Sequence, residues 1–159
     1  MEDAASNWLA HRSRETKIRR DARGHWYNDG VRIDHPGLVR SFNAWIDLAE
    51  DGRYCIKNDI NWAYIEVEGL PVFVRSVRFE PPSIRILSST LGVEESVSID
   101  TLIQDEHGVL YCRVKDGRLI ARLDSHAMLQ LEDHLDEDDH GVFLRSGEHI
   151  VRPKVSQVP

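Results

Sequence analysis

Apolar residues recur at helical spacing in two stretches of this chain, each beginning at an aspartate. The first stretch follows Asp34 and Pro36, and its apolar positions fall on one face of a helix: Leu38, Phe42, Trp45, Ile46 and Ala49. The second follows Asp124 and Ser125, with Met128, Leu131 and Leu135 three and four residues apart. An aspartate can accept hydrogen bonds from the free N–H groups of a first turn, so both stretches are predicted as capped amphipathic helices.

Apolar and polar residues alternate between these helices, as they do in half-buried strands. Residues 62–68 place two glutamates on one face and apolar side chains on the other. Further strands are predicted at 53–57, 72–79, 83–88 and 95–99. The Pro81-Pro82 pair separates two of them, because proline cannot donate to a ladder of hydrogen bonds.

The same order of elements occurs twice. Each half has a hairpin with an Asp-Gly turn, at Asp29-Gly30 and at Asp116-Gly117, followed by a capped helix, a glycine and a strand. The spacing from cap to closing glycine is 34 to 52 in one half and 124 to 141 in the other, which is 18 and 17 residues. Such elements are common, so the pattern fits either an internal duplication or a chance recurrence.

These elements predict an α+β fold. We expect two similar halves, each with a β-hairpin, an amphipathic helix and further antiparallel strands, forming curved or barrel-like sheets around the helices. A loosely packed N-terminal segment is expected at 1–24, the first half at 25–100, the second half at 101–152 and a tail at 153–159. With 159 residues and 41% hydrophobic content, the chain is long enough to bury a core.

The formal net charge of −7 is unevenly distributed. Residues 1–24 hold six Lys/Arg against four acids, a net +2 that leaves −9 for the remainder. That remainder would repel nucleic acid and anionic membrane, so neither is an expected partner. The stretch 12–20 could contact RNA or lipid headgroups, but its interleaved Glu15 and its lack of a neighbouring aromatic favour a solvated helix or arm.

The cysteines and the N-terminal sequence bear on cellular location. The sequence shows no run of about 18 apolar residues and no secretory signal after Met1, so we expect a cytoplasmic protein. Cys55 and Cys112 each follow a tyrosine within an apolar run. In a reducing compartment both are expected as buried thiols rather than as a disulfide.

Short motifs occur in a fixed order from residue 18 to about residue 150. The first group is Ile18, Asp21, Trp26, Gly30, Ile33, Leu38-Val39 and Phe42. The others are Gly52-Arg53-Tyr54, the segment 65–72, Val114-Lys115 and Leu119-Ile120-Ala121. Together they resemble the bacterial domain of unknown function 1285 family, with its Ile-x-x-Asp-Gly-x-Trp entry, Gly-x-Tyr, Ile-x-Val-Glu-Asp-x-Pro-Phe and final Leu-x-Ala.

The resemblance implies an α+β fold with repeated motifs, two similar halves and a part in ligand sensing or signalling, but it implies no reaction. Two departures stand out. Asn58-Asp59-Ile60-Asn61 stands where the family carries Thr-Pro-x-Glu, and Lys115 stands where it carries arginine. If the Thr-Pro-x-Glu segment lines a site, the ligand is expected to differ here.

Motifs for catalysis or metal binding are not found. The acidic run 133–139 echoes the start of a calcium loop, but its twelfth position is Gly147 instead of glutamate. His126 and His134 lie eight residues apart with no Cys or Glu at i+4. The sequence has no nucleophile elbow, P-loop, Cys-x-x-Cys or dinucleotide fingerprint. We therefore predict no catalytic residue, no metal ligand and no cofactor.

Basic residues alternate with apolar ones on several predicted strands, which describes either a solvent face or the cationic wall of a cleft: Arg75, Arg85, Arg113, Lys115, Arg118 and Arg122. We expect a ligand site at the junction of the halves, where Trp26 and Tyr54 would meet Arg113 and Lys115. Aromatic rings beside cationic donors suit an anionic small molecule, such as a planar or carboxylated metabolite.

The function expected from the sequence is small-molecule binding or signalling without catalysis. One alternative is an enzyme with a dispersed active site. Another is a protein interaction adaptor that uses Trp8, Trp26 or Trp62 as an anchor. The sequence gives no indication of the oligomeric state.

Overall fold

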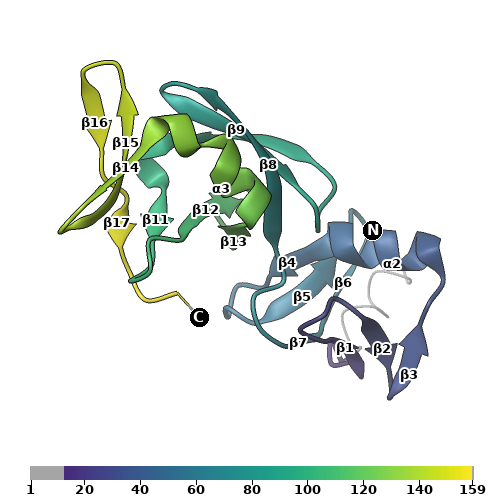
Figure 1. Cartoon of the computed structure of the whole chain (residues 1–159). Helices are drawn as coiled ribbons and strands as arrows, with labels where there is room; N and C mark the ends of the chain where they lie inside the picture. Colours follow the sequence, from purple (N-terminus) through teal and green to yellow (C-terminus); the bar gives the residue numbers. More distant parts are fainter. Residues whose placement is uncertain (1–12, 159) are drawn as a thin grey trace, which may run out of the picture.

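The computed structural model describes residues 13–158, and within them the chain forms two lobes that lie side by side (Figure 1). Helix α2 (Pro36–Trp45) belongs to the first lobe and α3 (Ser125–Gln130) to the second. Strands make up most of both lobes, so the α+β fold with curved sheets is confirmed. None of the described helices has the length and apolar character that crossing a membrane requires.

The first lobe consists of two small sheets and one helix. One sheet has the order β3-β2-β1-β7, and its strands are Val31–Ile33, Trp26–Asn28, Ile18–Arg20 and Glu66–Val67. The other has the order β4-β5-β6, with strands Ile46–Leu48, Tyr54–Lys57 and Trp62–Tyr64. Helix α2 packs on β5 and buries Phe42, whose ring lies 5.3 Å from that of Trp26.

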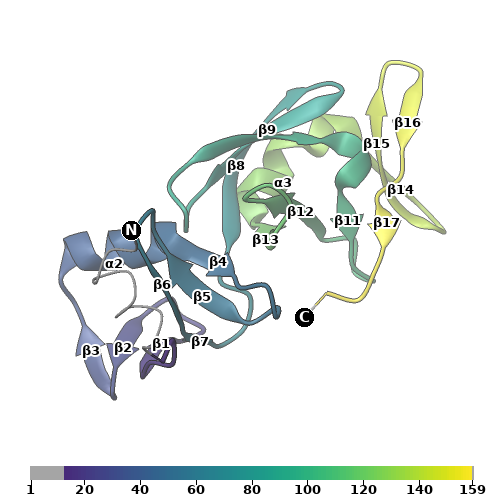
Figure 2. The same cartoon turned by 180° about the vertical axis from the view of Figure 1, so that it is seen from behind.

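The second lobe has a seven-stranded sheet of order β10-β9-β8-β13-β12-β11-β17, which curls around α3 (Figure 2). Its strands are Glu94–Ser98, Ser83–Ser88, Phe73–Glu80, Leu119–Leu123, Leu110–Val114, Ile103–Gln104 and Lys154–Val155. A further sheet, β14-β15-β16, consists of Leu135–Asp138, Gly141–Ser146 and His149–Val151. Two short 3-10 turns, Ile99–Thr101 and Glu132–His134, connect the elements.

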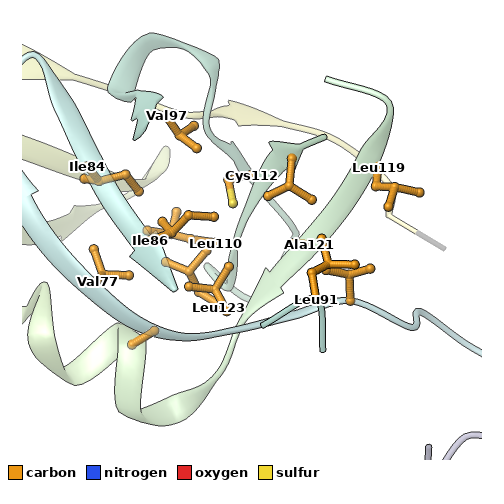
Figure 3. Packing of buried hydrophobic residues seen from close by; sticks show 14 of the residues in the cluster. Val77, Ile84, Ile86, Leu91, Val97, Leu110, Cys112, Leu119, Ala121 and Leu123 are labelled. Atoms are coloured by element: carbon orange, nitrogen blue, oxygen red, sulfur yellow. The ribbon is translucent and has the colours of Figure 1, made fainter. Parts of the chain in front are cut away.

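Inward side chains of neighbouring strands form the core of the second lobe (Figure 3). Ile84 and Ile86 alternate with outward residues on β9, as Ala121 and Leu123 do on β13. Cys112 is completely buried among them, and this burial raises the pKa of its thiol to about 12. Both cysteines are free and buried, as the sequence predicts.

The two lobes repeat one topology. In the first lobe β1 pairs antiparallel with β2 and parallel with β7, and in the second β11 pairs antiparallel with β12 and parallel with β17. The three-stranded sheets also match, because Ile46 pairs with Ile56 as Leu135 pairs with Leu144. The expectation of two similar halves is therefore confirmed.

A hydrogen-bonded aspartate repeats in equivalent places. Oδ1 of Asp21 accepts the N–H groups of Arg23 and His25, and Oδ2 accepts the Tyr27 hydroxyl. Asp105 accepts the N–H groups of His107 and Val109 and the hydroxyl of Tyr111 in the same arrangement. The two carboxylates hold the turns that lead into β2 and β12.

The expected boundaries of the halves need correction. Within 1–24, residues 18–20 form β1 and Arg20 is buried, so this part belongs to the folded lobe. Within the expected tail 153–159, Pro153 is buried and Lys154–Val155 forms β17. Strands β8, β9 and β10, assigned to the first half, join the second lobe because β8 pairs with β13. These strands pair in parallel or with partners far away in the sequence, so local sequence patterns do not predict the pairing.

The ends of both helices also differ from expectation. His35 caps α2 in place of Asp34, since its Nδ1 accepts the N–H of Leu38, and Ile46 already begins β4. Asp124 caps α3 as predicted, through the N–H of Ala127. Helix α3 ends at Gln130, so Leu135 lies in strand β14 instead of on the helix.

Candidate functional site: a hollow between the lobes

The structure does not bring the four expected ligand residues together. Trp26 is completely buried in the first lobe, where its Nε1 donates to Asn43 Oδ1 at 2.9 Å, so it cannot wall a ligand site. Tyr54 is half-buried against the core, and burial raises its pKa. Arg113 is exposed on β12. Only Lys115 reaches the junction, because it lies in the turn that follows β12, where the chain leaves the strand with a positive φ.

The turn between β12 and β13 connects the second lobe to the first. Lys115, Asp116 and Gly117 adopt positive φ angles of 50°, 55° and 82°. The Lys115 ammonium donates to the carbonyl oxygens of Ala44 at 2.8 Å and Ile46 at 2.5 Å, at the C-terminal end of α2. Burial lowers the pKa of Lys115, although nearby Asp47 opposes that effect.

Arg118 forms the second contact of this turn. Its Nε and Nη2 donate to the two oxygens of Asp47 at 2.8 and 3.0 Å, a bidentate pair between the lobes. Burial alone would raise the pKa of Asp47, whose side chain is 7% exposed, but the Arg118 fork and the Leu48 N–H hold it below the usual range. Asp47 is therefore a charged anchor for the second lobe.

A hollow of ≈ 880 Å³ opens beside this ion pair. It lies over the face of β4-β5-β6 that carries Asp47, Cys55 and Tyr64, which are neighbours across the strands. Its lining comes from both lobes and consists of Asp47, Leu48, Ala49, Glu50, Asp51, Cys55, Lys57, Trp62, Tyr64 and Arg118. The hollow thus lies at the junction where the sequence places a site, but it uses other residues.

Two aromatic rings form one wall of the hollow. Trp62 and Tyr64 meet edge to face with centroids 5.0 Å apart, and the Tyr64 hydroxyl donates to Asp51 at 2.7 Å, which lowers the pKa of that carboxyl. Arg14 lies over Trp62 at 4.7 Å and Arg53 over Tyr64 at 3.6 Å. The alternation of Trp62 and Tyr64 along one strand is the sequence signal that could have identified this wall.

In the second lobe, Phe143 occupies the position that corresponds to Cys55. Cys55 pairs with Asp47 as Phe143 pairs with Asp136, so the two side chains occupy the same place in their sheets. The Phe143 ring is covered by the guanidinium groups of Arg145 and Arg152, at 5.7 and 5.1 Å from its centroid. A small, buried thiol in the first lobe therefore stands where its repeat carries a phenyl ring.

Another hollow, of ≈ 750 Å³, lies along α3. It is lined by residues of the second lobe alone, including Phe73, Met128 and Leu129 on its apolar side and Arg122 and Glu132 on its polar side. Since it receives nothing from the first lobe, the hollow at the junction remains the candidate site.

The described residues contain no group of three or more His, Cys, Asp or Glu that could hold a metal ion. The acidic run forms the hairpin of β14 and β15 instead of a helix end. Within it Asp136 pairs with Arg145 at 3.3 Å, and Asp138 pairs with Arg152 at 2.5 Å. Arg145 and Arg152 thus form ion pairs with the two carboxylates whose spacing resembles the start of a calcium loop.

Fold and site together define a class: two-lobed α+β proteins built by repetition of one unit, with a hollow where the lobes meet. No family model matches the chain, and no curated protein matches it. Among solved structures, a DUF1285 family protein from Silicibacter pomeroyi DSS-3 has a TM-score of 0.61 at 19% identity, over 88% of this chain and 80% of its own.

A second solved structure shows the same likeness. A DUF1285 family protein from Shewanella baltica OS155 has a TM-score of 0.52 at 20% identity, over 71% of this chain and 87% of its own. The resemblance to this family is confirmed at the level of the fold. The departing segment 58–61 is the turn between β5 and β6, flanked by Lys57 and Trp62 of the hollow.

Proposed function

We propose that this chain is a small-molecule binding module without catalytic activity, and that its ligand occupies the hollow between the lobes. The observation that carries the proposal is a space of ≈ 880 Å³ lined from both lobes at a position where the repeat has Phe143. Ligand pockets for metabolites commonly enclose about 300–1,000 Å³, with aromatic walls and a few polar groups.

The chemistry of the lining favours binding over catalysis. Cys55 is its thiol, and burial followed by the nearby Asp47 raises the pKa of that group, which keeps it protonated and poorly nucleophilic. Among the lining residues that the structure describes, none is a serine or a histidine. An enzyme with a dispersed site would need its acid or base from the carboxylates, Lys57 or Tyr64.

A signalling role rests on the position of Arg118. A ligand that touches both Arg118 and the face of β4-β5-β6 would bias how the two lobes sit together. The adaptor alternative has less support, because Trp26 is buried and Trp62 lies in the hollow, while Trp8 lies outside the described residues. The two free buried thiols suit the cytoplasm, the location that we propose.

An anionic ligand is supported by one group only. Arg118 is paired with Asp47 and Lys115 with the end of α2, so these cations are already engaged. Lys57 makes no side-chain hydrogen bond or ion pair with the residues that the structure describes, and it lines the hollow. We propose that Lys57 binds any anionic group of the ligand.

The test places a phenylalanine at position 55, the position that corresponds to Phe143 in the second lobe. Wild type, Cys55→Phe and Cys55→Ala are screened by thermal shift against a panel of cell metabolites, and ligands that stabilise the wild type are measured by calorimetry. We expect Cys55→Phe to lose these ligands and Cys55→Ala to keep them, because only the phenyl ring occupies the space. Retained binding by a folded Cys55→Phe protein would place the ligand elsewhere, and turnover of a ligand by wild type would favour the enzyme.

A further inference from the structure

The uncompensated charges of the hollow have opposite signs at its two ends. Asp47 is neutralised by Arg118, which leaves Glu50 and Asp51 on the turn before β5 and Lys57 at the last residue of β5. Glu50 makes no side-chain hydrogen bond or ion pair with the described part of the chain, and both oxygens of Asp51 face donors, Arg53 N–H and the Tyr64 hydroxyl. A carboxylate can accept more than one hydrogen bond per oxygen, so Asp51 keeps acceptor capacity.

The separation of these charges selects the length of a ligand. Asp51 is held at the hydroxyl of Tyr64, which pairs with Cys55, and Lys57 lies two residues further along β5, about 7 Å along the strand. A free α-amino acid is too short to span this length. An extended peptide advances about 3.3–3.6 Å per residue, so two or three residues carry an ammonium group and a carboxylate across it.

The Trp62–Tyr64 wall lies between the two charged ends. Tyr64 pairs with Cys55 and Trp62 pairs with Lys57. The two rings therefore lie one after the other beside β5, with Trp62 at the Lys57 end. Edge-to-face rings offer apolar area to a side chain in the middle of an elongated ligand. The aromatic wall and the opposite charges thus describe one ligand shape.

Resting on the proposed function of the hollow, we propose that its ligand is a short peptide with free ends. The peptide ammonium binds at Glu50 and Asp51, its carboxylate binds at Lys57, and its central side chain packs on Trp62 and Tyr64. The lining favours this zwitterion over a purely anionic metabolite, because two unneutralised carboxylates would repel a ligand that carries only negative charge.

The binding test uses trialanine and Ala-Leu-Ala against their N-acetylated and C-amidated forms, measured by calorimetry on the full chain. Each blocked end should weaken binding about tenfold, which is the loss of about 1.4 kcal/mol. In the Glu50→Gln, Asp51→Asn double variant the N-acetylated and free peptides should bind alike, and in Lys57→Gln the amidated and free peptides should bind alike. Asp59→Asn and Lys154→Gln, which change exposed residues outside the hollow, should keep the full discrimination.

The outcomes separate this inference from the function on which it rests. If metabolites of another class bind and Cys55→Phe abolishes their binding while peptides do not bind at millimolar concentration, the hollow is a site and the peptide is wrong. If peptides bind equally well with both ends blocked, the charged ends are wrong. If peptide binding survives in a folded Cys55→Phe protein, the location is wrong.

Discussion

Asp47 and Arg118 show how one residue pair defines the junction. The pair is bidentate, and the side chain of Asp47 is almost fully buried while that of Arg118 is 47% exposed. A carboxylate whose arginine partner is removed stays buried with its charge uncompensated. Removal of Arg118 therefore destabilises the fold mainly because the buried Asp47 carboxylate loses its partner.

Arg118→Ala is expected to lower the free energy of unfolding by about 1–2 kcal/mol near neutral pH. The pKa of Asp47 is held below the ordinary carboxyl value of about 4, so the stability that Arg118 contributes is present above that pH. It is lost as pH falls through the lower folded-state pKa. Urea unfolding at pH 7 and in acid should therefore show a gap between wild type and Arg118→Ala that narrows as the pH falls.

Arg113→Ala provides the control for that experiment. Arg113 is exposed on the same hairpin but takes no part in the junction, so its removal should leave stability unchanged at both pH values. A gap for Arg118→Ala that does not narrow as the pH falls would mean that Arg118 stabilises the fold by packing and not through Asp47.

Gln104 compensates for a backbone hydrogen bond that the first lobe has and the second lobe lacks. In the first lobe the N–H of Ile65 donates to Tyr54 O, but the corresponding residue in the second lobe is Pro153, which has no N–H. The amide of Gln104 donates to Val142 O and Pro153 O and accepts from Val142 N–H, at 2.7, 2.8 and 2.8 Å. A completely buried side chain thus pairs backbone groups that the proline leaves open.

Gln104→Met keeps the length of the side chain but removes all three hydrogen bonds. We expect a loss of about 2–4 kcal/mol, because buried backbone groups are left unpaired at about 1–3 kcal/mol each. Chemical denaturation measures this loss, and exposed Gln157→Met is the matched control. An unchanged midpoint for Gln104→Met would show that water reaches Val142 and Pro153.

At the scale of elements, helix α2 depends on the opposite lobe at its C-terminal end. The helix has no basic residue in its last turn, and the Lys115 ammonium supplies the positive charge to the carbonyl oxygens of Ala44 and Ile46. Free carbonyl groups at a helix end are stabilised by a nearby cation. The helix is therefore completed by a residue 71 positions away from Ala44.

Lys115→Ala should reduce stability by about 1–2 kcal/mol, since both hydrogen bonds are lost. Lys115 also holds a φ of 50°, a conformation that costs a non-glycine residue about 1 kcal/mol and glycine almost nothing. Lys115→Gly should therefore be less destabilising than Lys115→Ala when both are measured by thermal unfolding. The reverse order would show that the positive φ of Lys115 carries no conformational cost, and unchanged stability in both variants would mean that the helix cap contributes nothing.

For the whole molecule, one turn makes the polar contacts between the lobes. Among the described residues, the side-chain hydrogen bonds that cross the junction come from Lys115 and Arg118. Each lobe otherwise closes on its own sheets, as Figures 1 and 2 show. The polar part of the coupling between the lobes consequently comes from this turn, beside the apolar cluster that contains residues of both lobes.

Scanning calorimetry should show one transition for the wild type and two for the Lys115→Ala, Arg118→Ala double variant, because each lobe then unfolds on its own. The Arg113→Ala, Arg122→Ala double variant also removes two cations from this hairpin, both exposed, and should keep a single transition. A single transition in the junction variant would mean that apolar contacts alone couple the lobes.

The sequence by itself determined the local elements. Strand Ser83–Ser88 lies where alternation places it, the hairpin glycines Gly30 and Gly117 adopt positive φ, and Asp124 caps its helix. Each of these depends on a few neighbouring residues, so local patterns carry the information. The repeated order of elements follows from the same patterns, because both lobes use the same local signals.

Only the tertiary structure decided the lobe boundaries and the site. Parallel pairing joins short strands that are far apart in sequence, by 47 residues for Arg19 with Glu66 (β1 and β7) and by 51 for Ile103 with Lys154 (β11 and β17), and no turn links them. The hollow depends on Cys55 standing where the repeat has Phe143, and on Arg118 crossing from the other lobe. Residues so far apart in sequence meet through the packing of whole sheets, which periodicity within a single strand does not encode.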